Sequence, residues 1–227
     1  MAFGDLEYRC DPARATLVLV DVQVDFCTDV TADGRRPRPQ MEQMATRLVP
    51  LVEAARRAAV PVVFVQTIHD AASDSEAWRS RRGALVAYER ELCKPGSEGA
   101  EFFAVAPVAG EAVVVKHRYD AFVGTELDVV LRALGREAVI ATGVMTDICV
   151  ETTVRHALCL DYLTTTVSDC CAAGDEEQHE GTLRRLARSF GLVASAAELA
   201  ALWKVDLGGA PASADRIDQD AAVPQGR

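Results

Sequence analysis

The chain has 227 residues, of which 49% are hydrophobic and 26% are charged, a balance typical of a globular protein with one sizeable core. The formal net charge of −10 argues against a nucleic-acid surface, which requires clustered lysine and arginine. No apolar run reaches the roughly 18 residues that a membrane span needs, and the first residues do not read as a signal peptide. We therefore expect a cytoplasmic protein with neither nucleic-acid nor membrane partners.

Apolar runs alternate with helical spacings along the chain, which predicts an α/β fold whose parallel sheet has helices on both faces. In chain order we expect a strand at residues 15–22, a helix at 41–59 with Pro50 inside it, strands at 61–67 and 111–116, a helix from Thr125 to a stop at Gly135, a strand at 137–142, a helix after Thr146, a strand at 162–167, a helix at 175–190, a short strand at 192–193 and a helix at 196–203.

Two segments do not follow this alternation. Residues 208–227 are rich in Gly, Ala, Pro and Asp, and such a segment buries too little apolar area to order itself. We expect a single domain over residues 1–207 and a disordered tail after it. Residues 69–107 are polar and weakly patterned, and we expect them to cover the functional site. Their arginines Arg79, Arg81 and Arg82 either hold a substrate carboxylate or stay solvated, and the sequence leaves both readings open.

One of the seven cysteines stands in a position suited to catalysis. The cysteines are odd in number and form no CxxC pair, so we expect free thiols rather than a disulfide framework or a zinc knuckle. Cys149 follows an apolar strand at the point where a helix begins, and Thr146 is the predicted N-cap. Free backbone N–H groups and the helix dipole favour a thiolate there, which makes Cys149 a candidate nucleophile.

Three residues with ionisable side chains lie at or just after the ends of predicted strands. Asp25 comes just after the first strand, Lys116 ends the third, and Cys149 follows the fourth. Because parallel strands end at one edge of the sheet, where open α/β proteins bind ligands, we expect these three side chains to converge. No glycine-rich phosphate loop follows the first strand, and only His69 and Asp70 stand after the second, so we expect neither a nucleotide nor a metal cofactor.

The motifs that carry these residues resemble those of the isochorismatase-like cysteine hydrolases. The segments are Asp-Val-Gln-Val-Asp-Phe at 21–26, then Lys116, then Gly-Val-Met-Thr-Asp-Ile-Cys-Val at 143–150. This family includes nicotinamidases, N-carbamoylsarcosine amidases, and ureidoacrylate and biuret amidohydrolases, and the similarity runs from residue 15 to residue 203. It implies a three-layer α/β/α sandwich with a mostly parallel sheet of about six strands, assembled as a homodimer or homotetramer.

The resemblance also implies catalytic roles. Asp25, Lys116 and Cys149 take the positions of the catalytic triad, in which the thiolate attacks an amide-type carbonyl to form a thioester. The aspartate moves the proton, and the lysine lowers the pKa of the cysteine. The backbone N–H groups of Met145 and Cys149 form the oxyanion hole, next to a cis peptide bond between Val144 and Met145.

The expected function is hydrolysis of a C–N bond in a small amide, carbamoyl or ureido compound, with release of ammonia and without a metal. The isochorismatases of siderophore pathways lack the cysteine, so its presence argues against cleavage of a vinyl ether. Phe26, Trp78, Val144 and Met145 are the expected substrate-binding residues, although Trp78 is equally suited to packing. Two alternatives stay open: a cyclic-amide or antibiotic-inactivating hydrolase on the same scaffold, and a non-catalytic module that forms oligomers.

Overall fold

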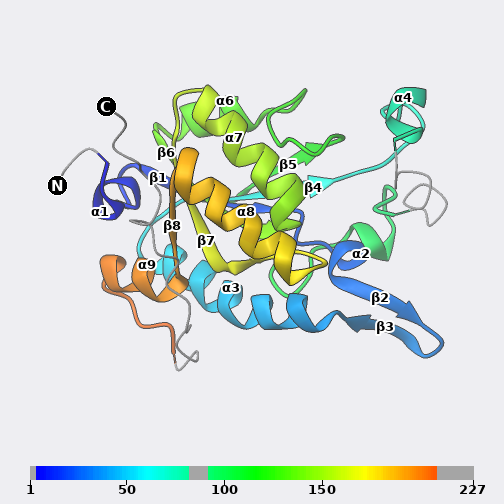
Figure 1. Ribbon diagram of the computed structural model, residues 1–227, viewed down its shortest axis with the longest axis horizontal. Helices are drawn as coiled ribbons and strands as arrows, with labels where there is room; N and C mark the ends of the chain where they lie inside the picture. Colours follow the sequence, from blue (N-terminus) through cyan, green and yellow to red (C-terminus); the bar gives the residue numbers. More distant parts are fainter. Residues whose placement is uncertain (1–3, 82–91, 209–227) are drawn as a thin grey trace.

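The computed structural model describes residues 4–81 and 92–208, and in this part a six-stranded sheet lies between two layers of helices (Figure 1). The strand order is β5–β4–β1–β6–β7–β8, and every neighbouring pair is parallel. The expected α/β/α fold is thereby confirmed. The strands are β1 (Ala15–Val20), β4 (Val62–Thr67), β5 (Ala112–Lys116), β6 (Ala138–Val144), β7 (Leu163–Ala172) and β8 (Leu192–Ala194).

The helices divide between the two faces of the sheet according to the core residues that they share. One layer holds α3 and α9, and the other holds α6, α7 and α8. Short helical turns lie mainly in the connections. The helical segments are α1 (Leu6–Arg9), α2 (Val24–Cys27), α3 (Pro39–Arg57), α4 (Glu76–Arg79), η1 (Glu98–Ala100), α6 (Leu127–Ala133), η2 (Thr146–Val150), α7 (Glu151–Cys159), α8 (Glu176–Ser189) and α9 (Ala196–Trp203).

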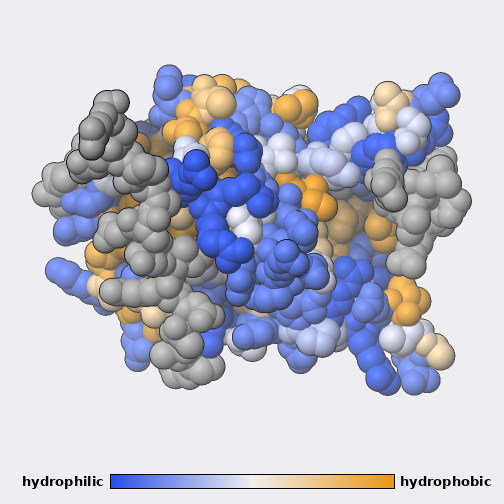
Figure 2. All heavy atoms as spheres, viewed as in Figure 1, coloured by the Kyte–Doolittle hydropathy of each residue, from blue (hydrophilic) through white to orange (hydrophobic). Residues whose placement is uncertain are grey.

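The central strand β1 shows why its sequence is a continuous apolar run. Leu17 and Leu19 pack in the core under α3, whereas Val18 and Val20 pack in the core under α6 to α8. Successive side chains of a strand point to opposite faces, so a strand covered on both faces must be apolar throughout. The outer surface of α8 is largely hydrophilic, as expected of an amphipathic helix that covers a sheet (Figure 2).

Besides small differences at element ends and short helical turns, three departures from the predicted elements concern the fold. An antiparallel hairpin of β2 (Thr28–Thr31) and β3 (Gly34–Pro37) was not predicted, and it projects from the body of the molecule (Figure 1). Its strands are short and mostly exposed, so they lack the apolar pattern that marks a buried strand. Strand β7 is longer than predicted and takes in the adjacent pair Cys170 and Cys171. Helix α3 starts at Pro39, two residues before the predicted start.

A close approach of two main chains positions the end of β6. Gly143 has a φ of +112°, and a Cβ atom there would lie 2.1 Å from the carbonyl oxygen of Val20. Glycine alone accepts both the positive φ and the contact. The end of β6, which leads to Cys149, therefore lies directly beside the end of β1. The predicted tail, apart from Gly208, and residues 82–91 of the predicted lid lie outside the described residues.

Candidate active site

A pocket of about 270 Å³ opens at the carboxyl ends of the strands, where an open α/β sheet binds its ligands. We call it the inner pocket. Helix α4 follows β4 and lies beyond the strand ends, at the same end of the molecule as the hairpin (Figure 1). The described residues that line the inner pocket are Asp21, Phe26, Thr67, His69, Trp78, Arg81, Lys116, Arg118, Tyr119, Val144, Met145, Ile148 and Cys149.

Cys149 lies in the first turn of the helical segment that follows β6, as predicted. That turn is the π-helical segment η2, which continues directly into α7. The N-cap is Met145 rather than the predicted Thr146, and its side chain makes no capping hydrogen bond. Thr146 lies inside the turn and pairs instead with His179 at 2.8 Å. The sulfur of Cys149 faces the inner pocket from a residue that is only 8% exposed.

Lys116, at the end of β5, joins two other strand ends. Its ammonium nitrogen Nζ lies 2.7 Å from Asp21 Oδ2 and 3.6 Å from the sulfur of Cys149. A third contact, at 2.8 Å, goes to the carbonyl oxygen of Arg118. Both Lys116 and Asp21 are 1% exposed. A buried ammonium is stable only when paired, so this geometry fixes the lysine between a carboxylate and a sulfur.

Asp21 is the carboxylate of this cluster. It follows β1 directly in the left-handed region, with a φ of 55°, a conformation that aspartate tolerates better than most residues. Its Oδ1 accepts a hydrogen bond of 2.8 Å from the hydroxyl of Thr67 at the end of β4. Its Oδ2 faces Lys116 and makes no well-aligned hydrogen bond to it. That oxygen therefore keeps a lone pair that can accept a proton.

The electrostatics of the cluster differ from the thiolate expected at a helix start. Burial raises the pKa of the Cys149 thiol well above its ordinary value, Asp21 raises it further, and Lys116 only partly opposes them. Burial also acts to lower the pKa of Lys116, but the charges of Asp21 and the sulfur outweigh it, so that pKa is raised. Burial and Asp21 thus favour the protonated thiol of Cys149, whereas Lys116 favours its thiolate.

Asp25, the aspartate of the predicted triad, lies elsewhere. Its carboxylate pairs with Arg35 of the hairpin at 2.7 Å and accepts a 2.6 Å hydrogen bond from the backbone N–H of Cys93. It packs so closely on Gly99 that a Cβ atom there would lie 1.9 Å from Asp25 Oδ2. Asp25 does not line the inner pocket, and the prediction that it converges with Lys116 and Cys149 is corrected: Asp21 takes that place.

The reason is a single helical turn. Asp25 lies in α2, and this turn separates it from the strand end, whereas Asp21 follows the last residue of β1 directly. The side chain of Gln23 fixes the segment between the two aspartates by donating hydrogen bonds of 2.9 Å to the carbonyl oxygens of Thr67 and Ala100. The signal was available in the sequence, because the first aspartate of the motif stands closer to the apolar run than the second.

The four predicted substrate-binding residues, Phe26, Trp78, Val144 and Met145, all line the inner pocket. The peptide bond between Val144 and Met145 is cis, as the family resemblance implies. Contact of these residues with substrate, and an oxyanion hole at Met145 and Cys149, stay predictions. Sequence reasoning missed Arg118 and Tyr119, which follow Lys116 closely, and His69, which was weighed only as a metal ligand.

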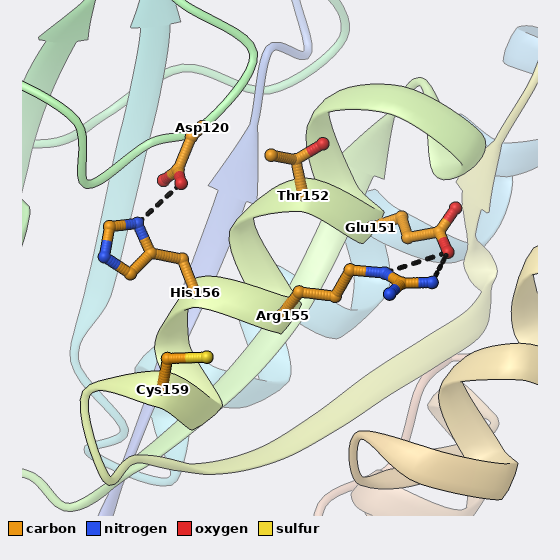
Figure 3. Close-up of a pocket in the computed structure, with 6 residues that line it drawn as sticks. All are labelled: Asp120, Glu151, Thr152, Arg155, His156 and Cys159. Atoms are coloured by element: carbon orange, nitrogen blue, oxygen red, sulfur yellow. Dashed lines mark hydrogen bonds and ion pairs between the residues drawn. The ribbon is translucent and has the colours of Figure 1, made fainter.

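A second, larger hollow lies on the outer side of α7, and we call it the outer hollow. It has a volume of about 550 Å³ and is lined by Asp120, Glu151, Thr152, Arg155, His156 and Cys159 (Figure 3). Its charged groups are paired with one another. His156 Nδ1 lies 2.5 Å from Asp120, and Arg155 lies 2.7 Å from Glu151. Cys159 is the one exposed thiol among the seven free cysteines, all of which lie in the described ranges.

Two further observations concern the described residues alone. No three His, Cys, Asp or Glu side chains are arranged there to hold a metal ion. In the same residues, every helix is too short or too polar to cross a membrane.

The fold and the cluster at the strand ends place the chain in a known class of hydrolases. Residues 15–198 match the Isochorismatase domain, and the chain belongs to this family. It is 31% identical to the ureidoacrylate amidohydrolase RutB of Methylobacterium radiotolerans, over 90% of this chain and 85% of that protein. A RutB of Methylorubrum extorquens is 30% identical over 86% of this chain and 85% of that protein.

Solved structures agree with this assignment. A cysteine hydrolase from Pseudomonas syringae pv. phaseolicola superposes with a TM-score of 0.76 at 27% identity, covering 85% of this chain and 93% of that one. The N-carbamoylsarcosine amidase from Thermoplasma acidophilum superposes with a TM-score of 0.64 at 28% identity, covering 81% of this chain and 96% of that one.

Proposed function

We propose that the protein is a cysteine amidohydrolase that cleaves a C–N bond of a small amide, carbamoyl or ureido compound and releases ammonia. One observation carries the proposal: Lys116 lies 2.7 Å from Asp21 and 3.6 Å from the Cys149 sulfur, on the wall of a pocket sized for a small molecule. A nucleophile, a proton acceptor and a fixed positive charge are the groups that acyl transfer needs.

The first half of the reaction forms a thioester. The sulfur of Cys149 attacks the substrate carbonyl carbon while its proton passes to the carboxylate of Asp21, which faces the sulfur. Lys116 stabilises the negative charge that develops on sulfur, and the backbone N–H groups of Met145 and Cys149 receive the charge that develops on oxygen. Asp21 then returns the proton to the departing nitrogen, the C–N bond breaks, and ammonia leaves.

The second half regenerates the thiol. A water molecule attacks the thioester carbonyl and gives one proton to Asp21, the C–S bond breaks, and the proton returns to the sulfur. The acid or carbamate product then leaves. The net reaction consumes one water and releases one ammonia and one acid or carbamate. No metal takes part in this scheme.

The raised pKa of Cys149 favours a scheme in which the proton moves during attack. A free thiolate at this buried position would be costly, so proton transfer to Asp21 accompanies attack instead of preceding it. Lys116 makes this possible because its charge offsets the burial of the developing thiolate. In this scheme Asp21 acts as a general base during attack, and Cys149 and Lys116 do not form a thiolate–ammonium pair beforehand.

The named relatives support the substrate class. Ureidoacrylate amidohydrolase and N-carbamoylsarcosine amidase are named for ureido and carbamoyl compounds, and the same class fits a pocket of about 270 Å³. We also propose a homodimer or homotetramer, on the family resemblance alone. Size-exclusion chromatography with light scattering tests it, and a monomer at micromolar concentration would refute it.

The test of the proposed function is ammonia release from a panel of small amides, ureas and N-carbamoyl acids. We expect turnover of at least one carbamoyl or ureido compound by the wild-type protein and none by Cys149→Ser. Ring opening of a cyclic amide releases no ammonia and is followed by mass spectrometry of the product; turnover confined to cyclic amides would favour the alternative hydrolase. A protein that binds no panel member and hydrolyses none would favour the non-catalytic module.

A further inference from the structure

The charges of the inner pocket are out of balance. Three cations line it, Arg81, Lys116 and Arg118, against the single carboxylate of Asp21. Lys116 and Asp21 neutralise each other at 2.7 Å. In the part of the chain that the structure describes, neither arginine forms an ion pair. Two positive charges thus remain in a concave site of a protein whose net charge is −10.

The two arginines share one aromatic side chain. The guanidinium carbon of Arg81 lies 3.4 Å from the ring centroid of Trp78, and that of Arg118 lies 4.9 Å from the same centroid. Tyr119 packs on the indole at 4.8 Å and accepts a hydrogen bond from Arg81 at 2.8 Å. Like charges held this close in a partly desolvated site repel each other, and a bound anion removes that repulsion.

Hydrogen-bond donors remain available on these groups. A guanidinium carries about five N–H donors. Arg81 directs two of its nitrogens to Tyr119 and to the carbonyl oxygen of Trp78. Arg118 directs two to the carbonyl oxygens of His117 and Ser73. The indole Nε1 of Trp78 is shielded from solvent and has no acceptor in the described ranges. An incoming group that carries several acceptor oxygens would satisfy these donors.

We propose that the substrate carries a carboxylate and that Arg81 and Arg118 bind it, which makes the substrate a small N-carbamoyl or ureido acid. The inference rests on the proposed function, because it concerns the molecule that Cys149 attacks. Arginine suits a planar carboxylate because two parallel N–H···O bonds form at once. Arg118 also contacts the cluster around Cys149, since its carbonyl oxygen accepts the 2.8 Å hydrogen bond from Lys116 Nζ.

The kinetic test compares acids with their neutral esters. Ammonia release is measured for N-carbamoylglycine and N-carbamoyl-β-alanine and for the methyl ester of each, with the wild-type protein, Arg118→Gln and Arg81→Gln. We expect each variant to lower kcat/KM for an acid about 10- to 100-fold, mainly through KM, and to change it less than about 3-fold for the ester. Arg118→Lys should recover part of the preference.

The matched control is Arg155→Gln in the outer hollow, which also removes an arginine but should leave the acid-to-ester ratio unchanged. Equal kcat/KM for acid and ester in the wild-type protein would overturn the carboxylate subsite while leaving the amidohydrolase function intact. A ratio that neither arginine variant moves would do the same.

A binding measurement keeps the inference testable if the wild-type protein hydrolyses none of these compounds. Isothermal titration of Cys149→Ser with the same acids and esters reports the subsite without turnover. Tighter binding of the acids, lost in Arg118→Gln, would support the subsite even if the proposed reaction failed. Failure of the acids to bind, or equal binding of acids and esters, would refute it.

Discussion

The inner pocket and the outer hollow each contain a cysteine with acidic and basic neighbours, yet the charged groups are arranged differently in the two places. In the outer hollow the charges pair with one another, His156 with Asp120 and Arg155 with Glu151, beside an exposed Cys159 (Figure 3). In the inner pocket a buried ammonium instead reaches the sulfur of Cys149 at 3.6 Å.

A large volume and a lining rich in ionisable groups therefore do not mark the inner pocket, because the outer hollow is the larger and also consists mainly of ionisable residues. What differs is burial and the direction of the charged groups. A charge aimed at a buried sulfur acts on it far more strongly than one that is neutralised and solvated. Variants at matched positions in the two places should therefore behave differently.

The largest contrast is between the two cysteines themselves. Cys149→Ser should lower kcat/KM by at least about 10³-fold, because a buried hydroxyl is a much weaker nucleophile than a thiol. Cys159→Ser should leave activity within about 2-fold, since surface substitutions away from the chemistry have little effect. Ammonia release by the two purified variants measures this. A loss of activity in Cys159→Ser comparable to that in Cys149→Ser would break the distinction between the two places.

The next contrast is between the two aspartates of the motif at residues 21–26. Asp21→Asn should lower kcat/KM about 10²- to 10⁴-fold, because an amide cannot carry the proton. Asp25→Asn should act on stability, lowering the free energy of unfolding by about 1–3 kcal/mol, because it removes the buried carboxylate beside Arg35 and leaves that arginine only the more distant, exposed Glu98. Urea unfolding and kcat/KM are measured on both variants. Our assignment requires that the larger kinetic loss fall on Asp21.

A smaller effect concerns the dependence of stability on pH. The pKa of Cys149 is raised in the folded protein, so its protonated thiol contributes stability that is complete below the thiol pKa of the unfolded chain, roughly 8.5. That contribution is lost as the pH rises toward the folded pKa. Between about pH 7 and pH 10 the stability of the wild-type protein relative to Cys149→Ser should fall by about 2 kcal/mol.

Urea unfolding of the wild-type protein and Cys149→Ser at both pH values measures this difference, with Cys159→Ser as the exposed control. A difference between the wild-type protein and Cys149→Ser that stays constant with pH would mean that folding does not shift the pKa of Cys149, and a difference that rises with pH would mean that Cys149 is already ionised at neutral pH. In that case the proton would have left the sulfur before substrate arrives.

The smallest expected effect is that of chelation. The proposed reaction uses Asp21, Lys116 and Cys149 and no metal ion. Dialysis against EDTA should change kcat/KM by less than about 2-fold. Loss of activity that zinc or another divalent ion restores would add a metal to the scheme.

The architecture was predictable because buried parallel strands have a strong signature. The continuous apolar run at β1 follows from burial of that strand on both faces. The helical spacing of apolar residues in α3 follows from burial of that helix on one face. The β2–β3 hairpin was missed because short exposed strands carry no such pattern. The position of Cys149 was predictable as well, since its strand and the first turn of its helix are both marked in the sequence.

The site was only partly predictable, for reasons of local geometry. Lys116 ends β5 and Cys149 lies in the first helical turn after β6, so parallel topology brings them to the same edge of the sheet. Asp25 was misassigned because one turn of helix after β1 removes it from the edge of the sheet, and the sequence alone gives that turn only weak support. Arg81 and Arg118 stack on Trp78 from separate loops, an arrangement that depends on tertiary packing and not on any periodicity.

The most direct test of the account is to detect the acyl-enzyme. The wild-type protein is mixed with the compound of the panel that releases ammonia fastest, quenched in acid, digested and analysed by mass spectrometry. We predict an acyl group on the peptide that contains Cys149 and none on the peptide that contains Cys159, and hydroxylamine should remove it as expected of a thioester. An acyl group on another residue, or turnover of the same compound by Cys149→Ser, would contradict the assignment of Cys149 as the nucleophile.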